Sequence, residues 1–142
     1  MLIEALAILA TALFAGAALY VSAVEQPARL ALPTETAIAE WRPSYRRATV
    51  MQATLAVLGT LLGIAAGLFT GGAIWIVAAF ALSAVVPFTL FVMWPTNKRL
   101  EDPALDLAGA EARALLVRWG RLHAVRTAIS LAALLLMLFA RI

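Results

Sequence analysis

The sequence predicts an all-α fold: a four-helix transmembrane bundle with up-down connectivity and short helical turns in its two long loops. The first reason is composition, because 64% of the 142 residues are apolar, only 13% are charged and the mean hydropathy is +0.95. Soluble domains usually carry about 25% charged residues. The second reason is that the charges fall between three long uncharged runs. We therefore expect one membrane domain over residues 1–142.

The lengths of the uncharged runs predict four membrane-spanning helices. The first run, 5–24, has the roughly 20 residues that a helix needs to cross a hydrocarbon core about 30 Å thick. The second run, 48–97, is too long for one crossing, and the paired glycines Gly71 and Gly72 divide it at a tight turn. The third, 127–140, is too short, so its span must begin in the polar segment before it. The predicted spans lie near residues 2–24, 49–69, 74–94 and 120–140.

The basic residues indicate how the bundle is oriented. Most of them lie in two segments on the same side of the bundle, 25–47 and 96–120. Because loops rich in arginine and lysine stay in the cytoplasm, we expect a bacterial inner-membrane protein with both termini outside the cytoplasm. A cleaved signal peptide is the alternative for the first span, since "VSA" at 21–23 resembles a cleavage site. However, the basic segment of a signal peptide is missing, and Glu4 stands there instead.

Small residues recur at helical spacing along the second span. Steps of three and four place on one helix face Tyr45, Thr49, Gln52, Ala56, Gly59, Gly63 and Gly67. Small side chains let two helix backbones approach closely. Packing within the bundle is the expected use of this face, and a homodimer through Gly59, Gly63 and Gly67 is the alternative.

A polar stripe marks the beginning of the last span. One helix face there carries Trp119, His123, Arg126, Thr127 and Ser130. An ionisable side chain at membrane depth needs a partner or a polar cavity. Glu25, which directly follows the first span, is the carboxylate expected to contact Arg126, with His123 nearby. We therefore predict a polar pocket at the cytoplasmic ends of the four helices.

The third span is predicted to be irregular. Pro87 leaves a backbone carbonyl without its helical donor, and Thr89 is placed to hydrogen-bond around the break. Pro95 disfavours a helical conformation in the residue before it, so the helix is expected to end at "WPTN". Asn97 would then emerge at the same end of the bundle as the polar stripe.

Four elements of the sequence carry a family resemblance. They are "VSAVEQPARL" after the first span, W-x3-Y-R-R before the second, "PFTLFVMWPTNKRL" closing the third and "RWGRLHAVRT" opening the fourth. Together they resemble the anthrone oxygenase-like family of small four-helix membrane proteins, over nearly the whole chain. The P-x-N and W-x3-H-x2-R elements are the most specific. The resemblance singles out Glu25, Trp41, Tyr45, Pro95, Asn97, Trp119, His123 and Arg126.

The resemblance implies an oxygenase that acts without a cofactor on a flat hydrophobic substrate. Fungal members of the family are implicated in oxidising anthrones to anthraquinones, whereas most bacterial members have no assigned activity. An anthrone can be deprotonated next to its carbonyl, and the anion can react with oxygen without a metal or flavin. His123 would be the base and Glu25 would orient its ring. Arg126 and Asn97 would stabilise the enolate oxygen. The pocket walls would be Trp41, Tyr45 and Trp119.

The residues also allow other functions. A tryptophan, a histidine and an arginine near a helix end also form an ordinary membrane-anchoring belt. The alternatives to an enzyme are a non-enzymatic small-molecule or haem-binding or transport module, and an accessory subunit of a membrane complex. One histidine permits a bis-histidine haem only when it is shared across a dimer. A metal site of His123, Glu25 and Asn97 lacks a recognisable short motif. The expected partners are a hydrophobic small molecule and the lipid bilayer, and no nucleic acid.

Overall fold

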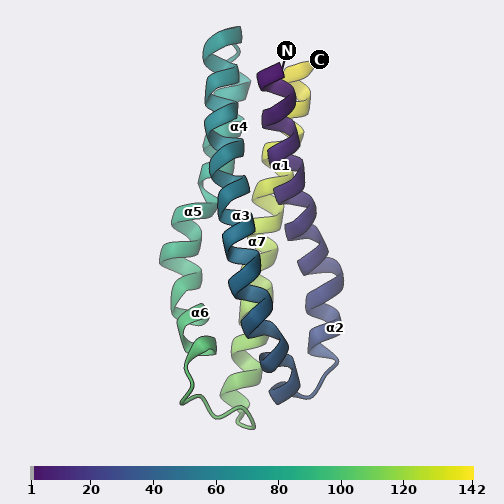
Figure 1. Cartoon of the computed structure of the whole chain (residues 1–142), viewed down its shortest axis with the longest axis vertical. Coiled ribbons are helices and arrows are strands. Elements are labelled where there is room, and N and C mark those ends of the chain that lie inside the picture. Colours follow the sequence, from purple (N-terminus) through teal and green to yellow (C-terminus); the bar gives the residue numbers. More distant parts are fainter. Residues whose placement is uncertain (1) are drawn as a thin grey trace.

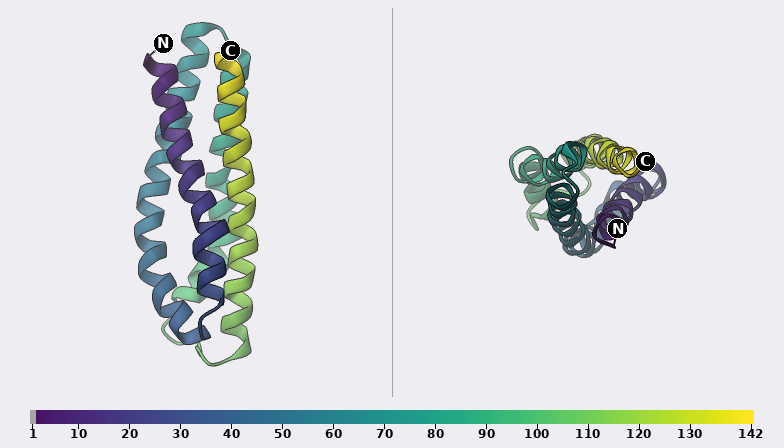
Figure 2. Two further views of the ribbon diagram at one scale, coloured as in Figure 1. Left: turned by 90° about the vertical axis from the view of Figure 1, so that its right-hand side faces the viewer. Right: turned by 90° about the horizontal axis from the view of Figure 1, so that it is seen from above.

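A computed structural model describes residues 2–142 as a bundle of long helical rods (Figure 1). Four rods are long and apolar enough to cross a membrane, at residues 2–30, 34–70, 73–101 and 110–141. Successive rods run in opposite directions (Figure 2). No strand occurs among the described residues. The predicted four-helix, up-down fold is therefore confirmed.

The first rod continues beyond its predicted end. Helix α1 (Leu2–Tyr20) passes into a π-helical turn, η1 (Val21–Glu25), and then into α2 (Gln26–Leu30). Pro27 does not end the helix: it lies at the start of α2, directly after the π-helical turn, where the helical hydrogen-bond pattern changes. The connection to the next rod is therefore only 31–33, much shorter than the loop of 25–47 that the sequence suggests.

Helix α3 (Thr34–Thr70) is the longest element. Its 37 residues, at 1.5 Å each, extend about 55 Å, which exceeds the roughly 30 Å of a hydrocarbon core. The short helical turns predicted before the second span are thus part of one continuous helix. Helix α3 ends at Gly71, whose φ of 71° is left-handed and therefore suits glycine. The glycine turn predicted between the second and third spans is confirmed.

The third rod is broken as Pro87 predicts. It consists of α4 (Ala73–Ser83), α5 (Val85–Pro87), the π-helical segment η2 (Phe88–Met93) and α6 (Trp94–Glu101). Thr89 Oγ1 donates to the Val85 carbonyl at 2.7 Å, which supplies a donor beside the proline. The predicted stop at "WPTN" is wrong, because Pro95 occupies the first turn of α6 and the helix continues beyond it. Below the break, the ribbon of the third rod runs farther from α3 than α4 does (Figure 1), and α6 is held to α3 by the hydrogen bond from Arg42 Nε to the Leu100 carbonyl.

The last rod is the single helix α7 (Ala110–Arg141), which follows the connection 102–109. Asp102 accepts the Ala104 N–H at 2.8 Å within that connection, so it caps a turn and not a helix. Both termini lie at one end of the bundle, and the connections 31–33 and 102–109 lie at the other (Figure 1). We call the half of the bundle that holds the termini the terminal half, and the half that holds the connections 31–33 and 102–109 the connecting half.

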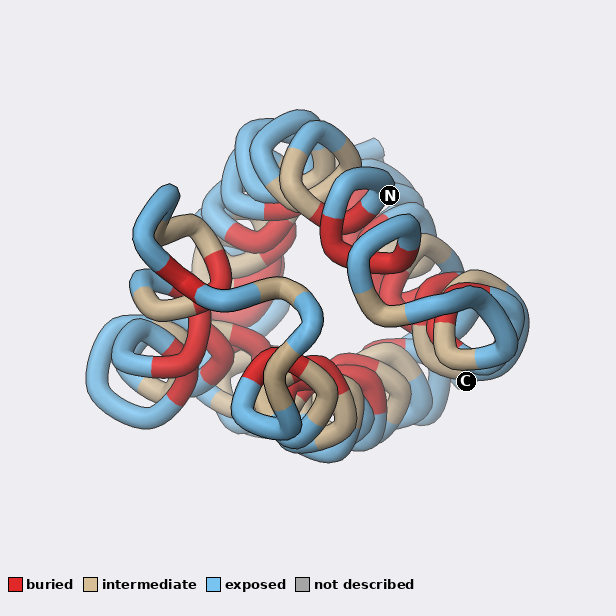
Figure 3. The backbone as a smooth tube through the Cα atoms, turned by 90° about the horizontal axis from the view of Figure 1, so that it is seen from below, coloured by how far each residue is buried: buried red, intermediate tan, exposed pale blue. Residues whose placement is uncertain are grey.

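The glycine face of α3 packs inside the chain. A Cβ atom built on Gly59 would lie 2.8 Å from both Leu82 and Thr11, and one built on Gly63 would lie 3.1 Å from Ala79. Buried residues line the inward faces of all the rods (Figure 3). The glycines thus serve contacts with α1 and α4, so they offer no free surface for the homodimer considered above.

The exposed apolar surface ends at a common level. In each rod, the large exposed hydrophobic residues extend from the terminal end as far as Val24, Val50, Trp94 and Val125. Beyond this level the exposed residues are charged side chains, alanines, prolines and threonines, and Leu32 in the connection 31–33 is the large exposed hydrophobic residue among them. This level marks the expected boundary between hydrocarbon and water, and the polar side chains described next lie beside it.

Candidate functional site

Glu25 is neutralised by a neighbour on its own rod. Its carboxylate pairs with Arg29, one helical turn away, and accepts a hydrogen bond from Ser44 Oγ at 2.7 Å. Arg29 also pairs with Glu40 and donates to Gln26 Oε1 at 2.7 Å. Although this guanidinium is buried, two carboxylates compensate its charge.

Arg126 has no such compensation. Its Nη2 donates to Gln52 Oε1 at 3.2 Å, and its guanidinium carbon lies 5.7 Å from the Phe14 ring centroid. Its Nε is buried and makes no hydrogen bond within residues 2–142. The predicted contact between Glu25 and Arg126 is therefore wrong. The physical reason is that η1 and α2 keep the chain helical, which brings Arg29 to Glu25 at i,i+4 spacing.

His123 is held by a chain of hydroxyl groups. Its Nδ1 lies 3.1 Å from Ser22 Oγ, which lies 2.8 Å from Thr127 Oγ1. Thr127 also lies within hydrogen-bond distance of the carbonyls of Ala18 and His123, at 3.0 and 3.2 Å. The predicted orienting partner, Glu25, is thus replaced by Ser22.

The order of donors along this chain sets the histidine tautomer. Carbonyls only accept and two of them lie beside Thr127, so we expect Thr127 to donate to a carbonyl and to accept from Ser22. Ser22 then accepts a hydrogen bond from His123 Nδ1–H, whereas the opposite order, with Thr127 donating to Ser22, would place the ring proton on Nε2. The remaining nitrogen, Nε2, keeps its lone pair and makes no hydrogen bond to any residue that the structure describes. This is the form of histidine that can accept a proton from a ligand.

Aromatic rings close one side of the site. Trp41 stacks on Tyr45 with 4.6 Å between ring centroids and meets Trp119 edge-on at 5.7 Å. Trp119 in turn lies 4.9 Å from the His123 ring. These contacts fix the orientations of the rings and form a wall of the kind that binds a flat ligand.

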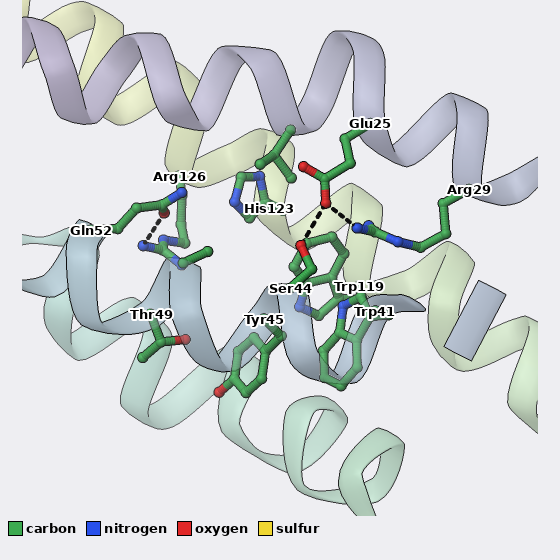
Figure 4. A pocket seen from close by; sticks show the side chains of 12 residues that line it. Glu25, Arg29, Trp41, Ser44, Tyr45, Thr49, Gln52, Trp119, His123 and Arg126 are labelled. Atoms are coloured by element: carbon green, nitrogen blue, oxygen red, sulfur yellow. Dashed lines mark hydrogen bonds and ion pairs between the residues drawn. The ribbon is translucent and has the colours of Figure 1, made fainter. Parts of the chain in front are cut away.

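The polar groups surround a small pocket, seen from close by in Figure 4. His123 lies between the Arg126–Gln52 pair and the Glu25–Ser44–Arg29 cluster (Figure 4). The pocket encloses about 20 Å³, which is room for about one water molecule. The predicted site residues that line it are Glu25, Trp41, Tyr45, Trp119, His123 and Arg126.

Asn97 is the predicted site residue that lies outside this pocket. It is on α6, close to the Tyr45 hydroxyl, and is almost fully buried. Neither atom of its side-chain amide has a hydrogen-bond partner in the described part of the chain. The extension of α6 past Pro95 carries Asn97 behind Tyr45, so a direct role beside His123 and Arg126 does not fit this arrangement.

Several residues of the site were not predicted from the sequence. They are Ser22, Arg29, Ser44, Thr49 and Gln52. A signal was present for two of them, because Ser22 and Gln52 are polar residues inside otherwise apolar runs, each on the inward face of its helix. Arg29 and Ser44 were hidden because their segment reads as a loop when only its prolines are considered.

Comparison with known proteins identifies the family. A profile of the anthrone oxygenase family matches residues 41–136, more than half of the chain. The chain belongs to the anthrone oxygenase family. The anthrone oxygenase tpcL of Aspergillus fumigatus is 50% identical over 56 residues, which is 37% of this chain and 34% of that protein. The match thus spans about a third of the curated relative's length. No solved structure matches the chain.

The arrangement of acidic residues and histidine bears on metal and haem binding. Among residues 2–142, no three side chains of histidine, cysteine, aspartate or glutamate cluster as metal ligands would. Asn97 is also separated from His123 and Glu25, so the metal site considered above is not assembled. His123 is 3% exposed and faces inward, so a haem shared between two copies would require the bundle to open.

Proposed function

We propose that this integral membrane protein is an oxygenase that converts an anthrone-like ring ketone into a quinone, using dioxygen and no metal or flavin. His123 Nε2 accepts the proton and Arg126 stabilises the resulting anion. Family membership supports the reaction class, since the similar fungal protein is an anthrone oxygenase. The chemistry of the site supports the roles of the residues.

The observation that carries this proposal is the uncompensated charge of Arg126. Arg126 is partly buried, its Nε is fully buried, and no carboxylate pairs with it among residues 2–142; such a charge costs free energy, so chains rarely keep one unless it acts on a ligand. Glu25 and Glu40 are already held by Arg29, which leaves Arg126 available to an anion from outside. A positive group placed before the reaction, where negative charge will develop, is the strongest common device of catalysis.

The reaction can be written with its atoms and electrons balanced. His123 removes one proton from the ring methylene, and the electron pair spreads to the carbonyl oxygen as an enolate beside Arg126. The anion gives one electron to dioxygen, and the two radicals combine at the former methylene carbon into a peroxide anion. Protonated His123 returns its proton to that anion and gives the hydroperoxide. Loss of water from that carbon leaves the second carbonyl. The substrate is oxidised by dioxygen, and one oxygen atom enters the quinone while the other leaves as water.

The spacing of the two groups suits this substrate class. His123 and Arg126 are three residues apart on α7, a spacing that puts their Cβ atoms roughly 5–6 Å apart. The methylene carbon and the carbonyl oxygen of an anthrone lie across one six-membered ring, a comparable separation. A general base can also act through one water molecule, for which the pocket has room.

The other predicted residues take supporting roles. Glu25 holds Arg29 and Ser44 in place and does not touch the histidine. Trp41, Tyr45 and Trp119 form the aromatic wall of the site. The hydrophobic substrate and the lipid bilayer are the partners expected of such a protein.

The test is quinone formation from an anthrone under air by the purified protein in lipid nanodiscs. We expect the wild type to exceed the rate in empty nanodiscs, with matched consumption of dioxygen. Arg126→Gln should lower kcat/KM about 100-fold, as the loss of one oxyanion donor does. Arg121→Gln is the matched control, because Arg121 is an exposed arginine of the same helix that does not line the pocket.

Two results would overturn the proposal. A wild-type rate equal to that of empty nanodiscs would show that the protein does not oxidise the anthrone. Equal rates for Arg126→Gln and Arg121→Gln would remove Arg126 from the mechanism. Binding of the anthrone without turnover would instead favour the non-enzymatic binding module.

We further propose that the protein lies in a bacterial inner membrane with both termini outside the cytoplasm. The support is the concentration of arginine in the connecting half. Single cysteines at Ala31 and Ala73, both exposed at opposite ends of the bundle, should react with an impermeant reagent from the inside and the outside respectively. Labelling of Ala31→Cys in intact spheroplasts would reverse the orientation.

A further inference from the structure

A second cavity adjoins the polar pocket on the side of the broken third rod. It encloses about 160 Å³ between α3 and the segment formed by α5 and η2. Its apolar walls include Ala53 and Ala56 of α3 and Val86 and Leu90 of the third rod. Val86 and Leu90 are exposed where lipid would surround the bundle. We call this cavity the lateral groove.

The lateral groove and the polar pocket share part of their lining. Tyr45, Thr49, Gln52 and Arg126 belong to both. Along α3 the lining runs from Tyr45 to Ala56, which are eleven helical steps or about 16 Å apart along the axis. The groove is therefore polar at the end next to Arg126 and apolar at the end that lies deeper in the membrane.

The volumes decide where a ring system can lie. The polar pocket has room for about one water molecule, so it cannot hold a fused aromatic ring. The lateral groove has 160 Å³, and an enclosed apolar cavity of about 150 Å³ is enough for one benzene ring. Because the groove is open on its lipid side, the remaining rings of a larger molecule can extend toward the bilayer.

The break in the third rod is what opens the groove. Above the break, α4 packs closely against α3 through the glycine face. Below it, Pro87 and the π-helical segment η2 displace the ribbon of the rod outward (Figure 1), and Val85 of α5 remains packed with Ala56 of α3 at the deep end of the groove. Without the break, the side chains of the third rod would continue the close packing and fill this space.

We propose that the lateral groove is both the entrance from the bilayer and the binding site for the ring system of the substrate. This inference rests on the proposed function and adds the route and the pose. The substrate enters between α3 and η2 with its apolar rings along Ala53 and Ala56. Its oxygen-bearing edge then meets Arg126, and its proton passes to His123 through the water-sized polar pocket. A lipid acyl chain is the competing occupant.

The test compares two substitutions on α3 that add the same side chain. Ala53→Phe places a ring inside the groove, whereas Val50→Phe places one on the lipid-facing surface nearby, because Val50 is 71% exposed and lines no part of the groove. Binding is measured in nanodiscs with anthraquinone, a ring ketone that is not oxidised further, by quenching of tryptophan fluorescence. Quinone formation from an anthrone is measured separately under air.

We expect Ala53→Phe to bind anthraquinone at least about tenfold more weakly than the wild type, because the new ring takes the space of a substrate ring. Val50→Phe should bind like the wild type. Equal binding by both variants, or no binding by the wild type, would show that the groove does not bind the ring system and would favour an acyl chain as its occupant. If Ala53→Phe alone loses binding and the wild type does not oxidise an anthrone, the groove remains the binding site and the proposed oxygenase activity is rejected.

A pair of substitutions on the other wall repeats the comparison if Ala53→Phe does not fold. Val86→Phe adds a ring from α5, and Val92→Phe adds one to an exposed position of η2 outside the groove. Weaker binding of anthraquinone by Val86→Phe alone supports the groove. Equal binding by this pair overturns it.

Discussion

The terminal half of the bundle is packed with alanine and glycine, whereas the connecting half is held together by arginine side chains. In the terminal half, Gly59 and Gly63 let α3 approach α1 and α4 to van der Waals distance. In the connecting half, Arg42 donates to the carbonyls of Leu100 and Asp102, each at 2.9 Å. The first arrangement brings helix backbones into close contact, and the second surrounds the polar pocket.

The two halves also differ in how completely their polar groups are satisfied. All the buried side-chain nitrogen and oxygen atoms found without a partner in residues 2–142 lie in the connecting half, on Trp41, Thr96, Asn97, Trp119 and Arg126. An unpaired buried polar atom costs about 1–3 kcal/mol, so such groups are expected where a ligand or water completes the bonding. The terminal half therefore carries the close packing that stabilises the bundle, and the connecting half carries the unpaired polar groups expected of a ligand site.

The largest effect is expected from His123→Gln in the connecting half. Glutamine can keep a hydrogen bond to Ser22 but cannot act as a base at neutral pH. The rate of quinone formation should fall about 1,000-fold, the scale of general-base catalysis and roughly 4 kcal/mol of barrier. The melting temperature should change little. A variant that keeps the wild-type rate would show that another group accepts the proton.

Gly63→Leu in the terminal half is expected to lower the stability of the bundle, whereas His123→Gln lowers the rate. A side chain there meets Met137 at 2.9 Å and Ala79 at 3.1 Å, so overpacking should cost about 3 kcal/mol of unfolding free energy. Thermal unfolding in detergent measures this loss. Gly16→Leu is the matched control, because Gly16 has no neighbouring atom within 4 Å of a built Cβ. Similar melting temperatures for the two variants would contradict the close packing assigned to the terminal half.

The sequence predicted the terminal half more completely than the connecting half. Run lengths and the Gly71–Gly72 turn follow from local composition, and the bundle confirms them. The pairing of Glu25 was wrong because the first span was ended with its uncharged run, whereas the rod continues through η1 and α2 and brings Arg29 to Glu25. The predicted end at Pro95 was wrong because α6 continues past it. A π-helical turn shifts the helix face by one residue, and no spacing rule anticipated η1 or η2.

Ser22→Ala should have an intermediate effect on catalysis. Removing the hydroxyl leaves His123 Nδ1–H without its acceptor, so the ring can adopt the other tautomer and lose its free Nε2 lone pair. We expect kcat to fall about tenfold, or about 1.4 kcal/mol, with an unchanged KM. Ser22→Thr should restore most of the rate. Ser83→Ala is the control, since Ser83 bonds only to the Phe80 carbonyl.

The tautomer itself can be observed directly. His123 is the only histidine in the chain, so ¹⁵N-histidine labelling gives a single imidazole to assign. The wild type should carry its proton on Nδ1, and Ser22→Ala should show a mixture of tautomers. A wild-type ring protonated on Nε2 would refute the order of donors assigned to the Ser22–Thr127 chain.

The smallest expected effects are changes in unfolding free energy, which should have opposite signs for two arginines of α7, Arg113 and Arg126. Arg113 donates to the carbonyls of Leu30 and Leu32 and thereby ties the connection 31–33 to the bundle, so Arg113→Met should lower the unfolding free energy by about 1 kcal/mol. Arg126 has an uncompensated charge and one long hydrogen bond, so Arg126→Met should raise it by about 1 kcal/mol while lowering kcat/KM about 100-fold. Thermal unfolding of both variants in the same lipid measures the difference. Gained stability with lost activity is the signature of a residue kept for its ligand, and destabilisation by both substitutions would make Arg126 a structural residue like Arg113.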